Sequence, residues 1–537
     1  MQFELPEIPP EQRTPLVESL LGLIRQLLDR VQQLEVTVQQ LRDDNARLKG
    51  EQARPVVRPS ALEAPTPKPK PGPRPGSAKR AKNSQLCIPE EIVLLPENLP
   101  PGAIFQGYEP YVVQELTIEA RATRYLRARF TLPAGGSVLA PLPPDVLLGR
   151  HFGPGLISYI LNQYHHAHVT QPLLWQQLRD YGIDISAGQL NRILTEDLDA
   201  FHQEKAAVLT AGLQTASYVG VDDTAARHQG HTGACTVIGN DLFAYFASTD
   251  HKGRLNFLQV LHGAQRCYAI NEVTVAYWER QGLAAAAVTA LQAGPSSFTD
   301  EAAWQAHLVA LGITGERSVR SATEGALLGG LIERSVSPTL VVLSDGAAQF
   351  DVLVHASCWV HAERPLARMV PYNDEHRALL EQLRTLIWEL YQALKAYRQQ
   401  PEAAQQPLLE ARFDALCNQQ TGYPRINQVL REMRDHRADL LRILERPEVP
   451  LHNNAAETDI REYVKKRKIS GSTRSDAGRC ARDTFTSLKK TCRKLGLNFW
   501  DYLQDRIRGR GQIPTLAELI RQRAAETAVP HVQAVPV

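Results

Sequence analysis

The sequence predicts a multidomain protein, with a coiled coil, a small β-rich module, a helix-turn-helix and an α/β core that is interrupted by helical insertions. Three observations predict this class. The chain has 537 residues, enough for about three to four units at roughly 100 to 200 residues each. Leucines recur every seven residues near the N-terminus. In the second half, short apolar strands that end in acidic residues alternate with long helical stretches.

The composition indicates a soluble globular protein. With 43% hydrophobic and 22% charged residues, it excludes collagen-like, wholly disordered and disulfide-scaffold classes. The N-terminus lacks the basic and apolar regions of a secretory signal, and no apolar stretch reaches the roughly 18 residues of a membrane span. Seven cysteines stand singly without a Cys-x-x-Cys pair, which favours reduced thiols over disulfides or zinc. We therefore expect a cytoplasmic protein with no membrane partner.

Residues 14–50 are predicted to form a leucine-zipper coiled coil. β-branched residues precede the leucines by three positions, a pattern that favours a parallel dimer, and Asn45 at one of these positions fits a residue that fixes register. An amphipathic helix packed on its own domain would need a broader apolar stripe. We therefore expect a homodimer. The expected dimerisation residues are Leu20, Leu27, Leu34, Leu41, Leu48 and Asn45.

Two segments of different composition follow the coiled coil. Residues 51–86 are rich in Pro, Lys and Arg and have few large apolar side chains, which predicts an extended basic linker. Its cations either contact phosphate or are simply solvated. Residues 87–148 contain short alternating runs, such as VVQELTIE and TRYLRARFTL, which predict a small β-rich module.

Residues 150–205 are predicted to be helical. The run PLLWQQLRDYGIDISAGQLNRIL predicts a helix, a turn with Gly182, and a second helix capped by Ser186 with Gln189 three residues on. This pattern suits a DNA-binding helix-turn-helix and equally suits two helices that merely pack together.

The first acidic pair lies in a predicted antiparallel meander over residues 216–249, with a hairpin turn at residues 239–241. Asp222 and Asp223 stand at the end of its first, apolar strand. Because successive strand residues point to opposite faces, at most one of these carboxylates faces a given site.

Two further acids follow. Asp345 comes directly after an apolar strand, and Glu457 lies near the start of a helix that Asn453 or Asn454 could cap. Each acid alone also suits a turn, a strand end or a helix N-terminus. Acids from two strands and one helix can converge and hold two divalent cations for phosphoryl transfer, and their oxygen ligands suit Mg²⁺ or Mn²⁺ rather than zinc.

The stretch from Glu457 to Arg510 is basic, with 15 Lys and Arg against 7 acids. Such an excess suits a DNA backbone, and the alternative is a solvated helix face.

These motifs resemble the transposases of the insertion sequence sixty-six family, members of the Asp-Asp-Glu group with an RNase H-like core. The resemblance covers most of the chain. Its first element is similar to Asp222-Asp223-Thr224, its second to Asp345-Gly346, and its third to Asn453-Asn454-Ala455-Ala456-Glu457. The further matches are the block Cys358-Trp359-Val360-His361-Ala362, then Arg461, Arg467-Lys468, Gly471-Ser472 and Cys492. The departures are Thr458, where the family usually has Arg, and the missing cysteine-rich zinc module, of which only Cys87 remains.

The resemblance implies a DNA transposase that cleaves transposon ends and transfers strands into target DNA, with Asp222, Asp345 and Glu457 as catalytic residues and ligands of two Mg²⁺ or Mn²⁺ ions. It implies terminal inverted repeats and target DNA as partners, nearby-encoded accessory proteins, a homodimer or higher oligomer, and association with the bacterial nucleoid. The expected DNA-binding residues are Arg461, Lys465, Arg467, Lys468 and Arg474. His361 suits a general acid, a DNA contact or a structural histidine.

The resemblance also sets the expected limits of the core. A catalytic domain is expected over residues 215–510, with helical insertions over about 255–335 and 366–447, and a C-terminal helix and tail over 511–537. Two alternatives remain open: a non-catalytic, regulatory derivative of a transposase, and an RNase H-like nuclease that cuts without joining.

Overall fold

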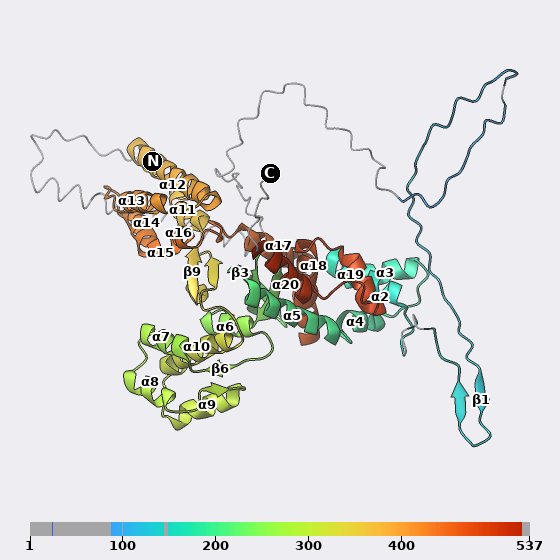
Figure 1. Cartoon of the computed structure of the whole chain (residues 1–537), viewed down its shortest axis with the longest axis horizontal. Helices are drawn as coiled ribbons and strands as arrows, with labels where there is room; N and C mark the ends of the chain where they lie inside the picture. Colours follow the sequence, from blue (N-terminus) through green and yellow to red (C-terminus); the bar gives the residue numbers. More distant parts are fainter. Residues whose placement is uncertain are drawn as a thin grey trace, which may run out of the picture. The chain divides into compact units, whose positions relative to one another are not determined.

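The computed structural model describes residues 87–98, 100–143, 146 and 149–528, together with Ile24 and Arg30 (Figure 1). The predicted coiled coil and the basic linker therefore lie outside the described residues, apart from those two positions. The chain divides into two units, residues 30–121 and the remainder, and each is considered by itself.

The predicted β-rich module contains less sheet than expected. Within the described part of residues 87–148, the strands are β1 (Arg129–Thr131) and β2 (Ser137–Leu139), an antiparallel pair. Gly135 and Gly136 in the connecting turn have φ values of 85° and 93°, which glycine adopts without strain. The rest of the described segment is irregular and mostly exposed.

The core of the larger unit is a mixed five-stranded sheet in the order β5-β4-β3-β8-β9. The first three strands form the expected antiparallel meander, and β8 and β9 run parallel to β3. The first strand does not end at the acidic pair as predicted, because pairing with β4 carries it on to His228. The strands are β3 (Tyr218–His228), β4 (His231–Gly239), β5 (Ala244–Thr249), β8 (Val341–Ser344) and β9 (Val354–Ser357).

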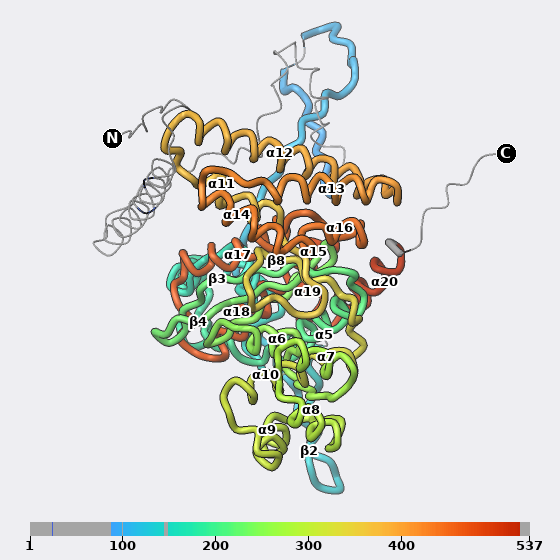
Figure 2. The backbone as a smooth tube through the Cα atoms, turned by 90° about the vertical axis from the view of Figure 1, so that its left-hand side faces the viewer, coloured from blue at the N-terminus to red at the C-terminus, as the bar shows by residue number. Residues whose placement is uncertain are grey.

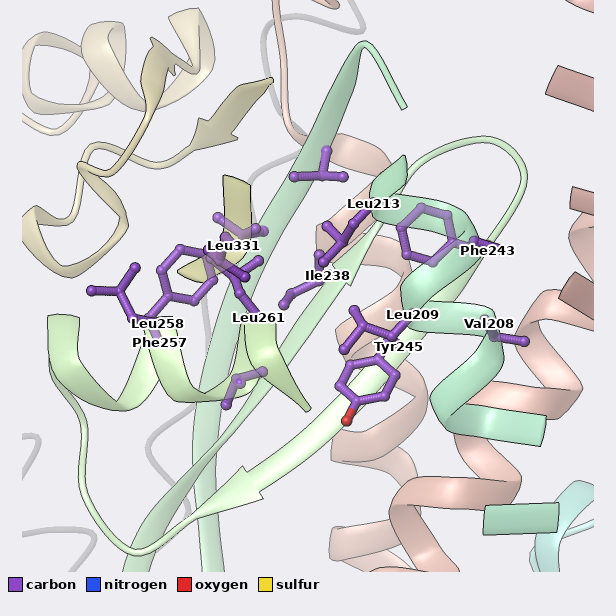
Figure 3. Close-up of a cluster of buried hydrophobic side chains, with 14 of the residues drawn as sticks. Val208, Leu209, Leu213, Ile238, Phe243, Tyr245, Phe257, Leu258, Leu261 and Leu331 are labelled. Atoms are coloured by element: carbon purple, nitrogen blue, oxygen red, sulfur yellow. The ribbon is translucent and has the colours of Figure 1, made fainter. Parts of the chain in front are cut away.

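One face of this sheet packs against α5 (Asp199–Thr215), α6 (Arg254–His262) and α10 (Glu316–Glu333) in the largest hydrophobic core. Figure 3 shows Leu209 and Leu213 of α5 beside Ile238 and Tyr245 of the sheet. The opposite face packs against α17 (Asn454–Ser470), whose Ala456, Ile460 and Tyr463 meet apolar residues of β4 and β5.

The outer edge of β5 is covered by α18 (Asp476–Lys494). Three side chains of this helix accept hydrogen bonds from β5 or the residue beside it. The Ala244 N–H donates to Thr491 Oγ1 (3.2 Å), the Phe246 N–H to Ser487 Oγ (2.9 Å) and the Ser248 N–H to Asp483 Oδ2 (2.7 Å). The edge strand therefore has its backbone donors satisfied within the chain.

Two helical segments interrupt the core, one between two strands of the sheet and one between the sheet and α17 (Figure 2). The first lies between β5 and β8, and a short ribbon of β6 (Tyr268–Ala269) and β7 (Ser297–Phe298) joins its helices. The second lies between α11 (Trp359–Ala367) and α17, and has its own hydrophobic core. Besides α6 and α10, these segments contain α7 (Glu272–Arg280), α8 (Ala285–Gln292), α9 (Glu301–Ala310), α12 (Asp374–Gln399), α13 (Gln406–Cys417), α14 (Pro424–Asp435), α15 (Arg437–Leu440) and α16 (Arg442–Glu445).

The predicted helix pair is present as α3 (Gln171–Asp180) and α4 (Ala187–Thr195). Ser186 and Gln189 form the predicted reciprocal capping box. With α2 (Pro154–Leu161) and the π-helical turn η3 (Asn162–His166), this pair shares the hydrophobic core of α18 and α19 (Phe499–Arg508). The pair is thus continuous with the larger unit.

The C-terminal helix α20 (Leu516–Ala528) packs against α5. No helix in the described part of the chain combines the length and apolar character that a membrane crossing requires.

Candidate active site

Asp222 lies in β3, and Asp345 directly follows β8, the parallel strand beside it. The parallel register of β3 and β8 pairs Tyr218 with Val341 and Gly220 with Leu343. Asp222 follows Gly220 by two residues, and Asp345 follows Leu343 by two residues. Since side chains two residues apart in a strand share a face, both acids belong to the face of the sheet that carries Gly220 and Leu343. We call this the acidic face. Asp345 is exposed, whereas Asp222 is partly buried.

The start of α17 lies on the acidic face. Asn453, just before the helix, donates from Nδ2 to the backbone oxygen of Val221 at 2.6 Å. A Cβ atom at Gly220 would stand 2.7 Å from Asn453 Oδ1 and 3.5 Å from Ala456 Cβ, so glycine permits this close approach. Glu457 follows in the first turn of the helix, close enough for its charge to act on Asp222.

The electrostatics of Asp222 agree with this convergence. The pKa of Asp222 is raised to about 6, mainly by burial and in part by the negative charges of Asp345, Glu457 and Asp223, while a hydrogen bond from the Asp223 N–H opposes the rise. The carboxylates therefore repel one another.

Asp223 has a different environment from Asp222. Its side chain is 8% exposed, and its oxygens lie 2.6 Å from Lys252 Nζ and 2.9 Å from Gln349 Nε2. Its charge is neutralised within the fold, since Lys252 approaches from the segment after β5. This supports the assignment of the site residue to Asp222.

Glu457 faces His361, which sequence reasoning left without a definite role. Glu457 Oε1 lies 3.8 Å from His361 Nδ1, and both atoms are buried without a hydrogen-bond partner among the described residues. Burial, and then Arg364, lower the pKa of His361, so the ring is neutral at pH 7. This contact could not be predicted from the sequence, because it depends on how α11 and α17 meet in the fold.

The block that contains His361 also supports the start of α17. Cys358 Sγ accepts a hydrogen bond from the Asn453 N–H at 3.3 Å, and the Trp359 N–H donates to the Leu451 carbonyl at 3.0 Å. Trp359 is buried in the core of the second insertion, as expected for a structural tryptophan.

The donor chemistry of the acidic face suits a hard cation. Glu457 Oε1 is a buried carboxylate oxygen that no described donor satisfies, and oxygen ligands are those that Mg²⁺ and Mn²⁺ prefer. In the arrangement that the structure describes, no three His, Cys, Asp or Glu side chains are grouped so as to hold a metal ion. The carboxylates of Asp222, Asp345 and Glu457 repel one another, so we expect them to stand apart where no cation balances their charges.

The five predicted DNA-binding residues fall into two groups. Three of them have partners in the fold. Arg461 lies 3.6 Å from Glu457 Oε2, and Lys465 lies 3.9 Å from Glu462 Oε2. Arg467 donates to Thr224 Oγ1 at 3.2 Å and to the Ala225 carbonyl. Lys468 and Arg474 are exposed and have no ion pair within the described part of the chain.

The basic stretch as a whole does not form one DNA-facing surface, which corrects a prediction from its charge. Lys466, Arg482, Lys489 and Lys490 are buried. Lys489 Nζ lies 2.6 Å from Glu462, and Lys490 Nζ lies 2.8 Å from Asp459. These pairs join α17 to α18, so these charges stabilise the fold.

Comparison with known proteins supports the interpretation of these motifs. A family model described as "Transposase IS66 family" matches residues 306–481, which include Asp345 and Glu457. The chain is also 39% identical over 321 residues to an uncharacterized protein, y4jO of Sinorhizobium fredii (strain NBRC 101917 / NGR234). That match covers 59% of this chain and 100% of the relative. The matched residues thus include the second and third acidic motifs, with Asp345 and Glu457. The chain belongs to the IS66 family of transposases.

Proposed function

We propose that the protein is a DNA transposase that cleaves transposon ends and joins the freed 3′ ends to target DNA at the acidic face. The observation that carries the proposal is the common face of Asp222 and Asp345 on neighbouring parallel strands, with Glu457 brought there by α17. The strand order β5-β4-β3-β8-β9 supports an RNase H-like core.

Asp222, Asp345 and Glu457 are the proposed ligands of two Mg²⁺ or Mn²⁺ ions. Bound in this way, such ions activate a water or a 3′-OH and stabilise the leaving oxygen of an in-line phosphoryl displacement. The same three carboxylates would serve end cleavage and strand transfer, because both reactions displace an oxygen at phosphorus.

The other residues of the site have supporting roles in this proposal. Neutral His361 limits the rotation of Glu457 without adding charge, and Arg461 lies one helical turn beyond Glu457. Arg467 is held on β3 close to Asp222, where it could contact a phosphate next to the reacting one. Lys468 and Arg474 would bind the DNA backbone further along, with affinity that falls as salt rises.

The proposed partners are terminal inverted repeats and target DNA. A homodimer or higher oligomer and nearby-encoded accessory proteins belong to the same proposal. Lys468, in the last turn of α17, and Arg474, just after this helix, are exposed cations that support a DNA partner.

The decisive experiment measures strand cleavage and joining on DNA with the native flanking ends, in the presence of Mg²⁺. The variants are Glu457→Gln and, as a matched control, Glu381→Gln, an exposed carboxylate of α12. At equal DNA binding, we expect Glu457→Gln to lose both reactions and Glu381→Gln to keep them.

Each other outcome identifies an alternative. Cleavage without joining would indicate a nuclease. Binding without cleavage by wild type, with Mn²⁺ and the neighbouring gene products also present, would indicate a regulatory derivative.

A further inference from the structure

Residues 116–132 have the pattern of one long, half-buried strand. Even-numbered positions are apolar except for Arg124, whereas odd-numbered positions carry polar, charged or tyrosine side chains. Strict alternation over this length is typical of a strand with one covered face. The apolar positions are Leu116, Ile118, Ala120, Ala122, Leu126, Ala128, Phe130 and Leu132.

Within each of the two units taken by itself, the structure leaves this apolar face uncovered. Leu116, Leu126 and Phe130 are 78%, 89% and 67% exposed. The only described strand beside the segment is β2, whose Val138 pairs with Phe130 and lies on the same face. The other edge of β1 has no described strand beside it. An open strand edge of this kind is a template for pairing with another chain.

The charges of the segment identify the partner that would fit. Glu115, Glu119 and Arg121 lie in its N-terminal half, which is net acidic, and Arg124, Arg127 and Arg129 lie in its C-terminal half, which is basic. An antiparallel second copy would place each acidic half opposite a basic half. A parallel copy in register would oppose like charges, which destabilises a strand pair.

We propose that two copies of this chain pair antiparallel through residues 115–132, along the edge of β1 that faces away from β2. The result is a four-stranded antiparallel sheet with the two β2 strands outermost and the apolar residues on one face. An isolated hairpin is marginally stable, whereas three or more strands with an apolar face can be stable. This dimer contact is independent of the acidic face.

Charge exchange in the full-length chain tests the antiparallel arrangement. Glu115→Arg with Glu119→Arg makes the segment all basic, and Arg127→Glu with Arg129→Glu makes its C-terminal half acidic. We expect each double variant alone to weaken the pairing about tenfold, since several like charges would then oppose each other. Co-expression of the two variants is expected to restore it.

Disulfide cross-linking provides the measurement. Single cysteines at positions 116, 118, 120, 122, 124, 126 and 128 are introduced after Ser replaces the exposed Cys87 and Cys480. If the strands pair antiparallel, identical positions face each other only near one central residue, so only the variants with a cysteine there cross-link with themselves. In mixed samples, a variant with its cysteine on one side of that residue cross-links with a variant that has its cysteine on the other side. The same scan with each charge variant gives the change in yield.

Three results would overturn the proposal. Self-cross-linking at every even position would indicate parallel strands. Absence of cross-links at all positions would exclude pairing between copies. Unchanged yields in the charge variants would exclude the complementarity on which the orientation depends. Thermal unfolding of the core serves as the control, because the substituted side chains are exposed and the core is expected to keep its melting temperature.

Discussion

The side-chain amide of Asn453 donates a 2.6 Å hydrogen bond to the backbone carbonyl of Val221, the residue directly before Asp222. This bond joins the start of the helix that carries Glu457 to the strand that carries the first acid. Asn453 is 2% exposed, so water cannot readily replace the bond. The relative position of these two acids therefore depends on a contact that involves neither of them.

Gly220→Ala is expected to disturb this contact. The added methyl group would meet Asn453 Oδ1 at 2.7 Å and displace the start of α17. We expect a loss of about 1–3 kcal/mol in stability and a larger fractional loss of cleavage activity. Gly188→Ala in α4 is the control, since its methyl group would meet only Ser186 Oγ, at 4.0 Å. Equal effects in the two variants, by thermal unfolding and cleavage assay, would contradict the close approach.

Asp222→Asn is expected to stabilise the metal-free protein at pH 7. The folded-state pKa of Asp222, about 6, lies above its ordinary value of 3.8, so its ionisation opposes folding increasingly as pH rises between those values. After allowance for its partial exposure, the gain in the variant is on the order of 1–2 kcal/mol, and it vanishes below pH 3.8.

Mg²⁺ should reverse this difference, because a bound cation stabilises the ionised wild type. Thermal unfolding with and without Mg²⁺ measures both effects. Asp223→Asn is the matched control, and we expect it to be destabilised by loss of the Lys252 contact while keeping the Mg²⁺ response. A wild type that responds to neither Mg²⁺ nor Mn²⁺ would contradict the proposed ligand set.

Glu462→Gln is expected to destabilise the protein in a pH-dependent manner. Hydrogen bonds with His168 and Lys489 hold the pKa of Glu462 well below its ordinary value of 4.5. The stabilisation is therefore complete above about pH 4.5 and declines as pH falls towards the folded-state pKa.

We expect Glu462→Gln to cost about 3 kcal/mol at pH 7, because it leaves Lys489 buried without its charge partner. Denaturant unfolding at several pH values measures the decline. Glu526→Gln, at an exposed position, should change stability little at any pH.

Lys468→Ala and Arg474→Ala are expected to weaken DNA binding. Each removes an exposed cation, so the slope of log affinity against log salt should fall by about 1 per substitution. Lys490→Met should instead lower stability and leave the slope unchanged, because Lys490 is buried against Asp459. Binding titrations at several salt concentrations would contradict the assignment if all three variants kept the wild-type slope.

Local patterns in the sequence predicted several of the strands and helices of the larger unit. The meander, the strand before Asp345 and the Ser186 capping box depend on neighbouring residues, and the structure has all three. That β3 and β8 bring Asp222 and Asp345 near each other was also predictable in outline, because strands far apart in sequence can pair in one sheet.

Other features depend on packing between distant segments. A lysine count cannot separate exposed Lys468 from buried Lys466, since the difference lies in which face of α17 meets Tyr164. The contact of His361 with Glu457 requires α11 and α17 to meet across 96 positions of sequence (457 − 361). The β-rich segment was over-predicted, because β2 is the one strand that pairs with its alternating pattern among the described residues.

The hydrogen bonds from β5 to α18 have a consequence for how the protein associates. Because Ser487 and Thr491 occupy the outer backbone donors of β5, this side of the sheet cannot recruit a strand from a neighbouring molecule. The helix thus prevents this edge of the sheet from acting as a template for a strand of another molecule.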